Sequence, residues 1–133
     1  MKNKKEVTER SFNPSQLSGF DGMHSIQLPV DFIHDLSKAD SLQAALDIIA
    51  YWISHVFDAD RASITLQDTD EYLKLYSISG NHAIPMDFKI PIGQTFVGRV
   101  FAQSQLIICD DLAQSNELDC QMLAEHGMGS CMD

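Results

Sequence analysis

The most reactive side chains in this chain belong to three cysteines, Cys109, Cys120 and Cys131. Thiolate and imidazole groups ligate metals, so a metal or haem site would use Cys120, His126 and Cys131. Their spacings match no compact zinc pattern, and the sequence contains no Cys-x-x-Cys. The odd count also fits no framework of paired disulfides for a secreted domain. We therefore expect reduced thiols with structural roles and no metal.

Other catalytic patterns are absent from the sequence. It has no Ser, His and Asp arrangement, no framework of paired carboxylates and no phosphate-binding loop. The remaining histidines, His24, His34, His55 and His82, are scattered singly, and an isolated histidine is ordinarily a solvated or capping residue. We therefore expect no enzymatic activity within these residues.

The charge of the chain is strongly acidic, at −10, and unevenly placed. Residues 1–10 hold four of the nine basic residues, which leaves five basic against seventeen acidic residues in the remainder. Such a body repels phosphate backbones and anionic lipid, so we expect neither nucleic acid nor a membrane as a partner. No apolar stretch approaches the ~20 residues of a membrane helix, and the amino end is polar rather than signal-like. A cytoplasmic location is expected.

The elements that must position these residues begin after a polar segment. Residues 1–27 show no apolar periodicity and carry turn-forming Asn, Ser, Gly and Pro, which predicts a flexible leader before a domain over residues 28–133. Pro29 favours a helix start, so a short helix is predicted over Val30–Ser37.

The strongest predicted element is a long helix from about Leu42 to Phe57, with Asp40 or Ser41 as its N-cap. Its apolar residues recur at spacings of three and four: Leu42, Ala45, Leu46, Ile49, Trp52, Ile53 and Val56. This single stripe needs a sheet or a partner helix to cover it. We expect burial against the sheet, while a parallel helix pair stays the alternative.

The strands follow the long helix. Ala62–Gln67 alternates apolar and polar residues and Tyr72–Ile78 forms a second run, so an antiparallel hairpin is predicted. The later elements are a short extended piece at Phe88–Ile90, a helix over Thr95–Ser104, a strand over Gln105–Cys109 and a helix over Ser115–His126 that Gly127 and Gly129 end.

Five segments in this order resemble the GAF domain, a small sensory fold of signalling proteins. They are the helix Leu42–Phe57, Asp60-Arg61-Ala62-Ser63-Ile64, the strand Tyr72–Gly80, Ile90-Pro91-Ile92-Gly93 with Gly98, and Leu106–Asp110. Gly93 would permit a tight turn, and Gly98 would let a helix lie close to the sheet. The resemblance covers residues 28–133 and implies an α+β fold with an antiparallel β-sheet flanked by helices.

The chain departs from the family at its end. Asp133 lies where the family normally starts another strand, followed by a further strand and a terminal helix. In this fold type the late strands lie in the middle of the sheet, so Ala62–Gln67 would otherwise have an unpaired edge. We therefore expect a carboxy-terminally truncated piece, stabilised by pairing with a second copy if it folds.

The resemblance also implies a ligand site. Small ligands in the family sit in a cup between one sheet face and the covering helices and loops. The implied ligand-binding residues are Ser63, Thr65, Tyr76, Phe96, Asp111 and Cys120. A structural alternative stays open for them: Ser63 and Thr65 facing solvent, Phe96 in the core, and Asp111 capping the next turn.

No cofactor is assigned, because the ligand signatures of the family are missing. The Asn-Lys…Phe…Asp-Glu signature of cyclic-nucleotide-binding members cannot be placed in this sequence. Tetrapyrrole-carrying members usually attach the chromophore through a cysteine next to a histidine. Cys120 lies in roughly the corresponding helix, but its neighbour is Gln121, so a covalent bilin is not expected.

The resemblance implies a non-catalytic sensory module that binds a small-molecule effector, forms a homodimer, or both, and thereby controls an attached cyclase or kinase. A structural dimerisation domain without ligand is one alternative. Another is a free methionine sulfoxide reductase, whose nucleophile follows the glycine turn, where this chain has Phe96, Val97 and Gly98. Only Cys120 fits a redox position, and one thiol without a resolving partner cannot complete a disulfide cycle.

Overall fold

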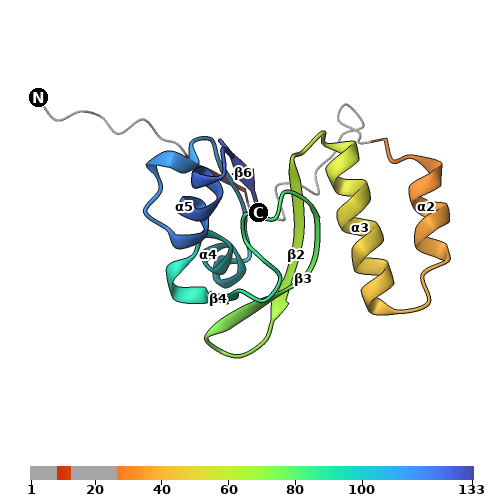
Figure 1. Ribbon diagram of the computed structural model, residues 1–133, viewed down its shortest axis with the longest axis horizontal. Coiled ribbons are helices and arrows are strands. Elements are labelled where there is room, and N and C mark those ends of the chain that lie inside the picture. Colours follow the sequence, from red (N-terminus) through yellow and green to blue (C-terminus); the bar gives the residue numbers. More distant parts are fainter. Residues whose placement is uncertain (1–8, 13–26) are drawn as a thin grey trace, which may run out of the picture. The chain divides into compact units, whose positions relative to one another are not determined.

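The computed structural model describes residues 9–12 and 27–133, which belong to two compact units (Figure 1). We call residues 27–90 the hairpin unit. Residues 9–12 and 91–133 form the cysteine unit, which contains all three cysteines. Both units combine helices with an antiparallel sheet, so the predicted α+β fold class is confirmed. In residues 9–12 and 27–133 no helix has both the length and the apolar character needed to cross a bilayer.

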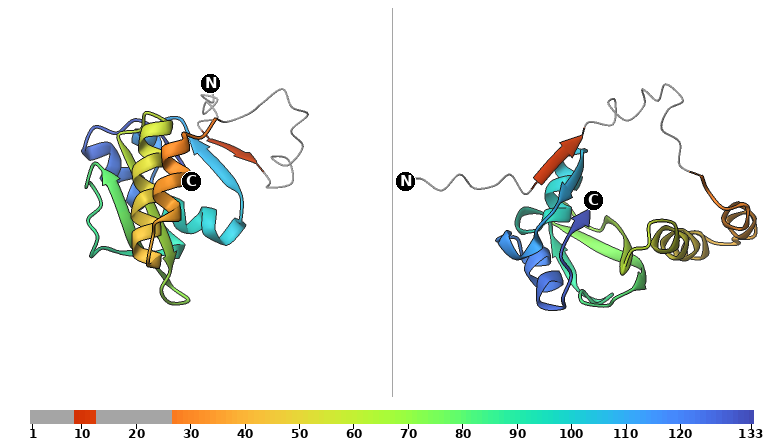
Figure 2. Two further views of the ribbon diagram at one scale, coloured as in Figure 1. Left: turned by 90° about the vertical axis from the view of Figure 1, so that its right-hand side faces the viewer. Right: turned by 90° about the horizontal axis from the view of Figure 1, so that it is seen from above.

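The hairpin unit places two helices beside a three-stranded sheet. Its helices are α2 (Val30–Ser37) and α3 (Leu42–Val56), and its strands are β2 (Arg61–Gln67), β3 (Tyr72–Gly80) and β4 (Lys89–Pro91) in the order β2-β3-β4. Helix α3 packs against β3 and β2, and α2 packs against α3. Figure 2 looks down both helices in its right-hand view, where they run side by side. The predicted arrangement of a long helix across an antiparallel hairpin is confirmed.

Helix α3 begins at a side-chain cap. Ser41 has extended backbone angles, and its Oγ accepts a hydrogen bond from the Ala44 N–H at 3.1 Å. The sequence left Asp40 and Ser41 as alternatives, and the structure selects Ser41. We expect Ser41→Ala to lower the free energy of unfolding by about 1 kcal/mol, because one N–H of the first turn loses its partner. Urea unfolding measures this, and Asp40→Ala is the matched control that should change little.

The face of α3 that meets the sheet differs from the expectation. Small and polar residues face β3, with Ala50 buried, whereas the apolar stripe was predicted to lie there. The hydrogen bonds run from Gln43 Nε2 to Tyr76 O at 2.6 Å, from Ser77 Oγ to Asp47 Oδ1 at 2.6 Å, and between Ser54 Oγ and Ser79 Oγ at 3.0 Å. These bonds satisfy the polar groups of both elements, which removes the penalty for placing them at the interface.

The predicted apolar stripe is consequently divided. Trp52 packs toward α2, where its ring lies 6.2 Å from that of Phe32 and its Nε1 donates to Asp35 Oδ2 at 2.9 Å. Four stripe residues remain partly or largely accessible to solvent: Leu42, Leu46, Ile49 and Ile53. We call these four the exposed stripe.

The β2–β3 hairpin contains one irregularity. Ile64 lies opposite Ser77, but Thr65 lies opposite Leu75, so Tyr76 is an extra residue on β3. Such a bulge bends the strand and redirects the side chains around it. The bulge therefore lies next to Gln43, which donates to the carbonyl of Tyr76.

The cysteine unit is built on a second sheet, with strand order β1-β5-β6. Its strands are β1 (Glu9–Phe12), β5 (Leu106–Cys109) and β6 (Cys131–Met132), all antiparallel. The strand at Glu9–Phe12 corrects the prediction of a flexible leader for those four residues. Residues 1–8 and 13–26 of the predicted leader lie outside the described part of the chain.

Short helices connect the strands of the cysteine unit. They are η1 (Ile92–Gln94), α4 (Phe96–Gln103), η2 (Leu112–Gln114) and α5 (Leu118–Glu125). The helices predicted over Thr95–Ser104 and Ser115–His126 are confirmed with shorter bounds. Helix α5 ends as expected at Gly127, which has a φ of 82° and donates its N–H to Ala124 O, while the Met128 N–H bonds to Leu123 O. This pair of bonds is a Schellman motif.

Candidate functional site

The amino end of α4 is held by a carboxylate from another helix. Asp119 of α5 is only 4% exposed, and its Oδ1 and Oδ2 accept hydrogen bonds from the N–H groups of Phe96 at 2.8 Å and Val97 at 3.0 Å. Thr95 caps the same turn by accepting from the Gly98 N–H at 3.1 Å. Unpaired N–H groups and the helix dipole favour an anion at the amino end of a helix. The Asp119 carboxylate is the anion at this end of α4. Asp119 thereby fixes α4 to α5.

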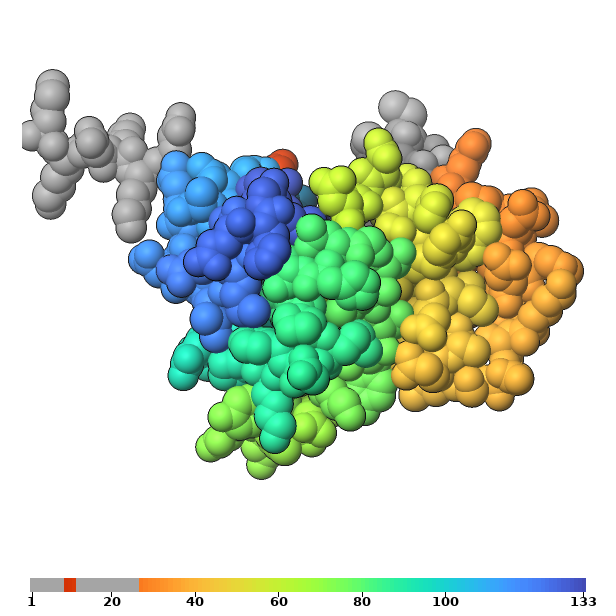
Figure 3. Space-filling model, viewed as in Figure 1, coloured from red at the N-terminus to blue at the C-terminus, as the bar shows by residue number. Residues whose placement is uncertain are grey.

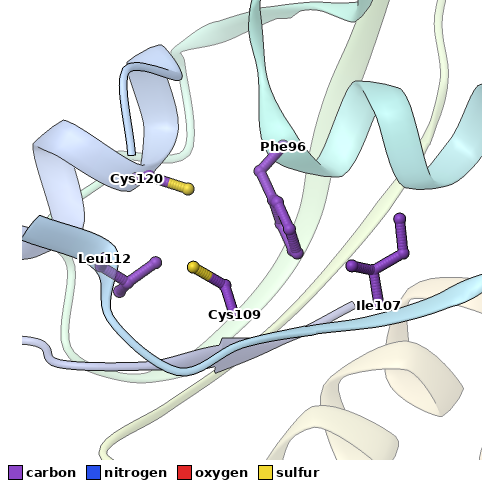
Figure 4. Close-up of a cluster of buried hydrophobic side chains, with 5 residues drawn as sticks. All are labelled: Phe96, Ile107, Cys109, Leu112 and Cys120. Atoms are coloured by element: carbon purple, nitrogen blue, oxygen red, sulfur yellow. The ribbon is translucent and has the colours of Figure 1, made fainter. Parts of the chain in front are cut away.

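Phe96 and Cys120, two of the predicted ligand-binding residues, meet in the core of the cysteine unit. Both are fully buried, and they cluster with Ile107, Cys109 and Leu112 (Figure 4). In Figure 4 the sulfur atoms of Cys109 and Cys120 lie on the same inner side of the cluster, between β5 and α5. Their observed environment is that of packed core residues, and their role in binding a ligand stays a prediction.

Asp111, a third predicted site residue, caps a turn. Its side chain accepts a hydrogen bond from the Ala113 N–H at 3.1 Å, at the start of η2. The neighbouring Asp110 forms an exposed ion pair with Arg10 of β1 at 2.8 Å. Both aspartates therefore already have hydrogen-bond partners within the protein.

The other three predicted residues, Ser63, Thr65 and Tyr76, lie on the β2–β3 hairpin. Ser63 is exposed, and Thr65 and Tyr76 are half-buried. The bulge at Tyr76 falls between the pairings of Ser63 and Thr65 along the hairpin. Lys74 Nζ lies 5.6 Å from the centre of the Tyr76 ring. All three residues therefore lie on the same two-stranded hairpin, and their role in binding a ligand stays a prediction.

A shallow, open depression of about 450 Å³ lies on the cysteine unit. It is lined by Gly93, Gln94, Asn116, Glu117, Leu118 and Gln121. None of the six predicted ligand-binding residues lines it. The sequence offered no signal for it, since its walls come from two short segments with ordinary turn and helix compositions.

Arg99 of α4 joins two carboxylates from distant parts of the chain. Its guanidinium lies 2.6 Å from Glu9 of β1 and 2.7 Å from Glu117, and it stacks over the Phe96 ring with its Cζ at 5.2 Å from the ring centre. Hydrogen bonds to Glu117 and Glu9 raise the pKa of Arg99 above its usual value, so the side chain stays charged. This network explains why β1 is held on the sheet although its own sequence is short.

The three cysteines, all free thiols, come together in the cysteine unit. Cys109 and Cys131 are cross-strand partners on β5 and β6, and Cys131 packs against the buried cluster that contains Cys109 and Cys120. The interaction between the Cys120 and Cys131 thiols lowers the pKa of Cys120 and raises the pKa of Cys131, whereas burial raises the pKa of Cys109. The argument that Cys120 lacks a second thiol is therefore wrong, since β6 brings Cys131 to it.

Comparison with known proteins identifies the class. A family model described as the GAF domain matches residues 41–133, well over half of the chain, so the chain belongs to the GAF domain family. The fold is similar to the crystal structure of the GAF domain from Acinetobacter phosphoenolpyruvate-protein phosphotransferase, with a TM-score of 0.58 and 18% sequence identity. The match covers 65% of this chain and 56% of that structure, so this chain spans little more than half of it. A search of curated proteins finds no significant match.

Proposed function

We propose that this chain is a non-catalytic regulatory module of a signalling protein, which pairs with a second copy through α3 and controls an attached cyclase or kinase. Membership of the GAF family supports the regulatory class, because domains of this family are generally sensory or regulatory. The observation that carries the proposal is the exposed stripe of α3.

The spacing of the exposed stripe is that of a helix–helix contact. Leu42, Leu46, Ile49 and Ile53 are separated by four, three and four residues, as are the a and d positions of a heptad repeat. Leu42 is 65% exposed and Ile53 is 40% exposed, so both ends of the stripe are open, while Leu46 and Ile49 between them are half-buried. Val30 of α2, at 82% exposed, adds to the apolar surface of the helix pair, and both helices are open to solvent in Figure 3.

A second copy of the chain is the occupant that fits this surface. The stripe is apolar along its length, so it matches another apolar stripe of the same spacing, and a two-fold axis brings identical stripes together. A charged partner would form few favourable polar contacts with this surface. The polar side chains of α3 that could bind it, Asp47 and Ser54, already form hydrogen bonds with β3.

Helix α3 also connects the stripe to the predicted ligand residues of the hairpin. Gln43 bonds to the carbonyl of Tyr76, and Asp47 bonds to Ser77. A small effector that contacts Ser63, Thr65 or Tyr76 and shifts β3 would therefore move α3 with it. In a dimer such a movement changes the packing of the two helices, which is the kind of displacement that an attached domain can read.

Leu42→Glu tests the proposal, since it places a carboxylate at the exposed stripe of each copy. We expect dimers in the unmodified chain by sedimentation equilibrium, and at least about 100-fold weaker dimerisation in the variant, because burying two like charges is strongly unfavourable. Leu66→Glu is the matched control: Leu66 is 38% exposed on β2, outside the stripe, and this variant should dimerise normally. A monomeric unmodified chain, or equal weakening by both substitutions, would overturn the proposal.

A further inference from the structure

The open depression on the cysteine unit has walls that accept hydrogen bonds and carry no positive charge. Gln94, Asn116 and Gln121 are exposed amides, and their side chains have no hydrogen-bond partner among the described residues. The charged lining residue is Glu117, and Leu118 adds an apolar wall. The volume of about 450 Å³ is that of a site for a small molecule.

Glu117 belongs to a group of ion pairs in which negative charge is in excess. Arg99 lies 2.7 Å from Glu117 and 2.6 Å from Glu9, so one guanidinium faces two carboxylates and the group keeps one negative charge. The Glu117 side chain is still 25% exposed. A carboxylate has about four acceptor positions, of which the hydrogen bonds from Arg99 use two. Glu117 can therefore accept hydrogen bonds from a second cation.

The amino end of α5 does not cancel this negative charge. Glu117 is the N-cap residue of α5, and the positive end of a helix dipole disfavours a cation. Asp119, in the first turn of α5, already offsets that end with a carboxylate, whose Oδ1 accepts from the Cys120 N–H at 3.0 Å. The net charge of −10 further favours a cationic ligand over an anionic one.

An organic cation suits this depression better than a metal ion does. In residues 9–12 and 27–133 no group of three or more His, Cys, Asp or Glu side chains is arranged to hold a metal. An ammonium or guanidinium group instead needs one carboxylate and neutral acceptors around it, and the lining residues supply both.

We propose that this depression binds a small organic cation, whose ammonium or guanidinium group donates hydrogen bonds to Glu117 and to the amide oxygens of Gln94, Asn116 and Gln121. A short carbon chain on the ligand packs against Leu118. The site shares no residue with the exposed stripe, so it stands independently of dimerisation through α3.

An NMR titration of the ¹⁵N-labelled chain with butane-1,4-diamine tests this. Butane-1,4-diol is the uncharged probe of the same length. We expect the diamine, and not the diol, to cause saturable shifts of the side-chain N–H₂ signals of Gln94, Asn116 and Gln121. A salt concentration of about 0.15 M screens the general attraction between an acidic chain and any cation.

Two substitutions change the charge of the depression in opposite directions. Glu117→Gln should weaken binding of the diamine at least about tenfold, because it removes a charged acceptor. Gln121→Glu should strengthen binding about two- to fivefold, because it adds a carboxylate to the wall. Glu117→Gln also removes a partner of Arg99, so circular dichroism checks its fold, whereas Gln121→Glu leaves that ion pair in place.

Matched controls make the same changes of charge outside the depression. Asp110→Asn removes an exposed carboxylate that is paired with Arg10, and Gln103→Glu adds one at the end of α4. Both variants should bind the diamine as the unmodified chain does. Shifts that do not saturate, equal binding of the diol, or control variants that change the affinity as much as Glu117→Gln and Gln121→Glu would overturn the proposal.

Discussion

Gly98→Ala should lower the free energy of unfolding by about 3 kcal/mol, because a methyl group at this position collides with backbone and not with a flexible side chain. A Cβ on Gly98 would lie 2.3 Å from Ile92 O and 2.5 Å from Ile92 Cα. Relief would require α4 to move away from η1, which would disturb the buried Phe96 at the start of the helix. Urea unfolding followed by circular dichroism measures the change.

Gly93→Ala is the matched control, since both glycines belong to the motif that suggested the family. A Cβ on Gly93 has no neighbour within 4 Å, and Gly93 is not among the glycines with positive φ. The expectation that the turn requires a glycine at position 93 is therefore wrong, and this variant should unfold as the unmodified chain does. Equal effects of the two substitutions would contradict the close approach of α4 to Ile92.

Asp119→Ala should destabilise the chain by a similar amount, about 3 kcal/mol, because it leaves the amide groups of Phe96 and Val97 buried without acceptors. Asp119→Asn should lie between, since its amide keeps one acceptor oxygen but turns an N–H₂ group toward the other donor. The midpoint of urea unfolding reports both values.

Asp111→Ala provides the comparison for this series. Asp111 also accepts a backbone hydrogen bond, from Ala113, but at an exposed turn where water replaces it. We expect a loss of at most about 1 kcal/mol. If the losses in Asp119→Ala and Asp111→Ala were equal, the contact between α4 and α5 would contribute no more than an exposed cap.

The order and type of the elements were predictable because they depend on local patterns. The 3.6-residue period of Leu42–Val56 and the alternation of Ala62–Gln67 give the helix and the strand directly. The sequence did not predict which face of each helix packs against the sheet. Periodicity identified an apolar stripe on α3, but the face that meets the sheet is the one where Asp47 accepts a hydrogen bond from Ser77 and Ser54 shares one with Ser79.

The interactions that hold the cysteine unit together escaped sequence reasoning for a different reason. Asp119 bonds to residues 22 and 23 positions away, and Arg99 pairs with Glu9 at a separation of 90 residues. The residues that flank a carboxylate or guanidinium side chain do not show whether that group is solvated or bonded to a residue far away in the sequence. The packing of Cys131 against the cluster that contains Cys120 was overlooked for the same reason, since β6 has only two residues.

The separation between Glu9 and Arg99 has a consequence for biosynthesis. The hairpin unit is contiguous in sequence, so a growing polypeptide can complete it soon after Ile90 leaves the ribosome. Strand β1 emerges first but must wait for β5 and Arg99, roughly 5–20 s at ordinary translation rates of 5–20 residues per second. During that interval β1 has no partner strand within the chain. The charged side chains of Glu9 and Arg10 disfavour its pairing with strands of other proteins.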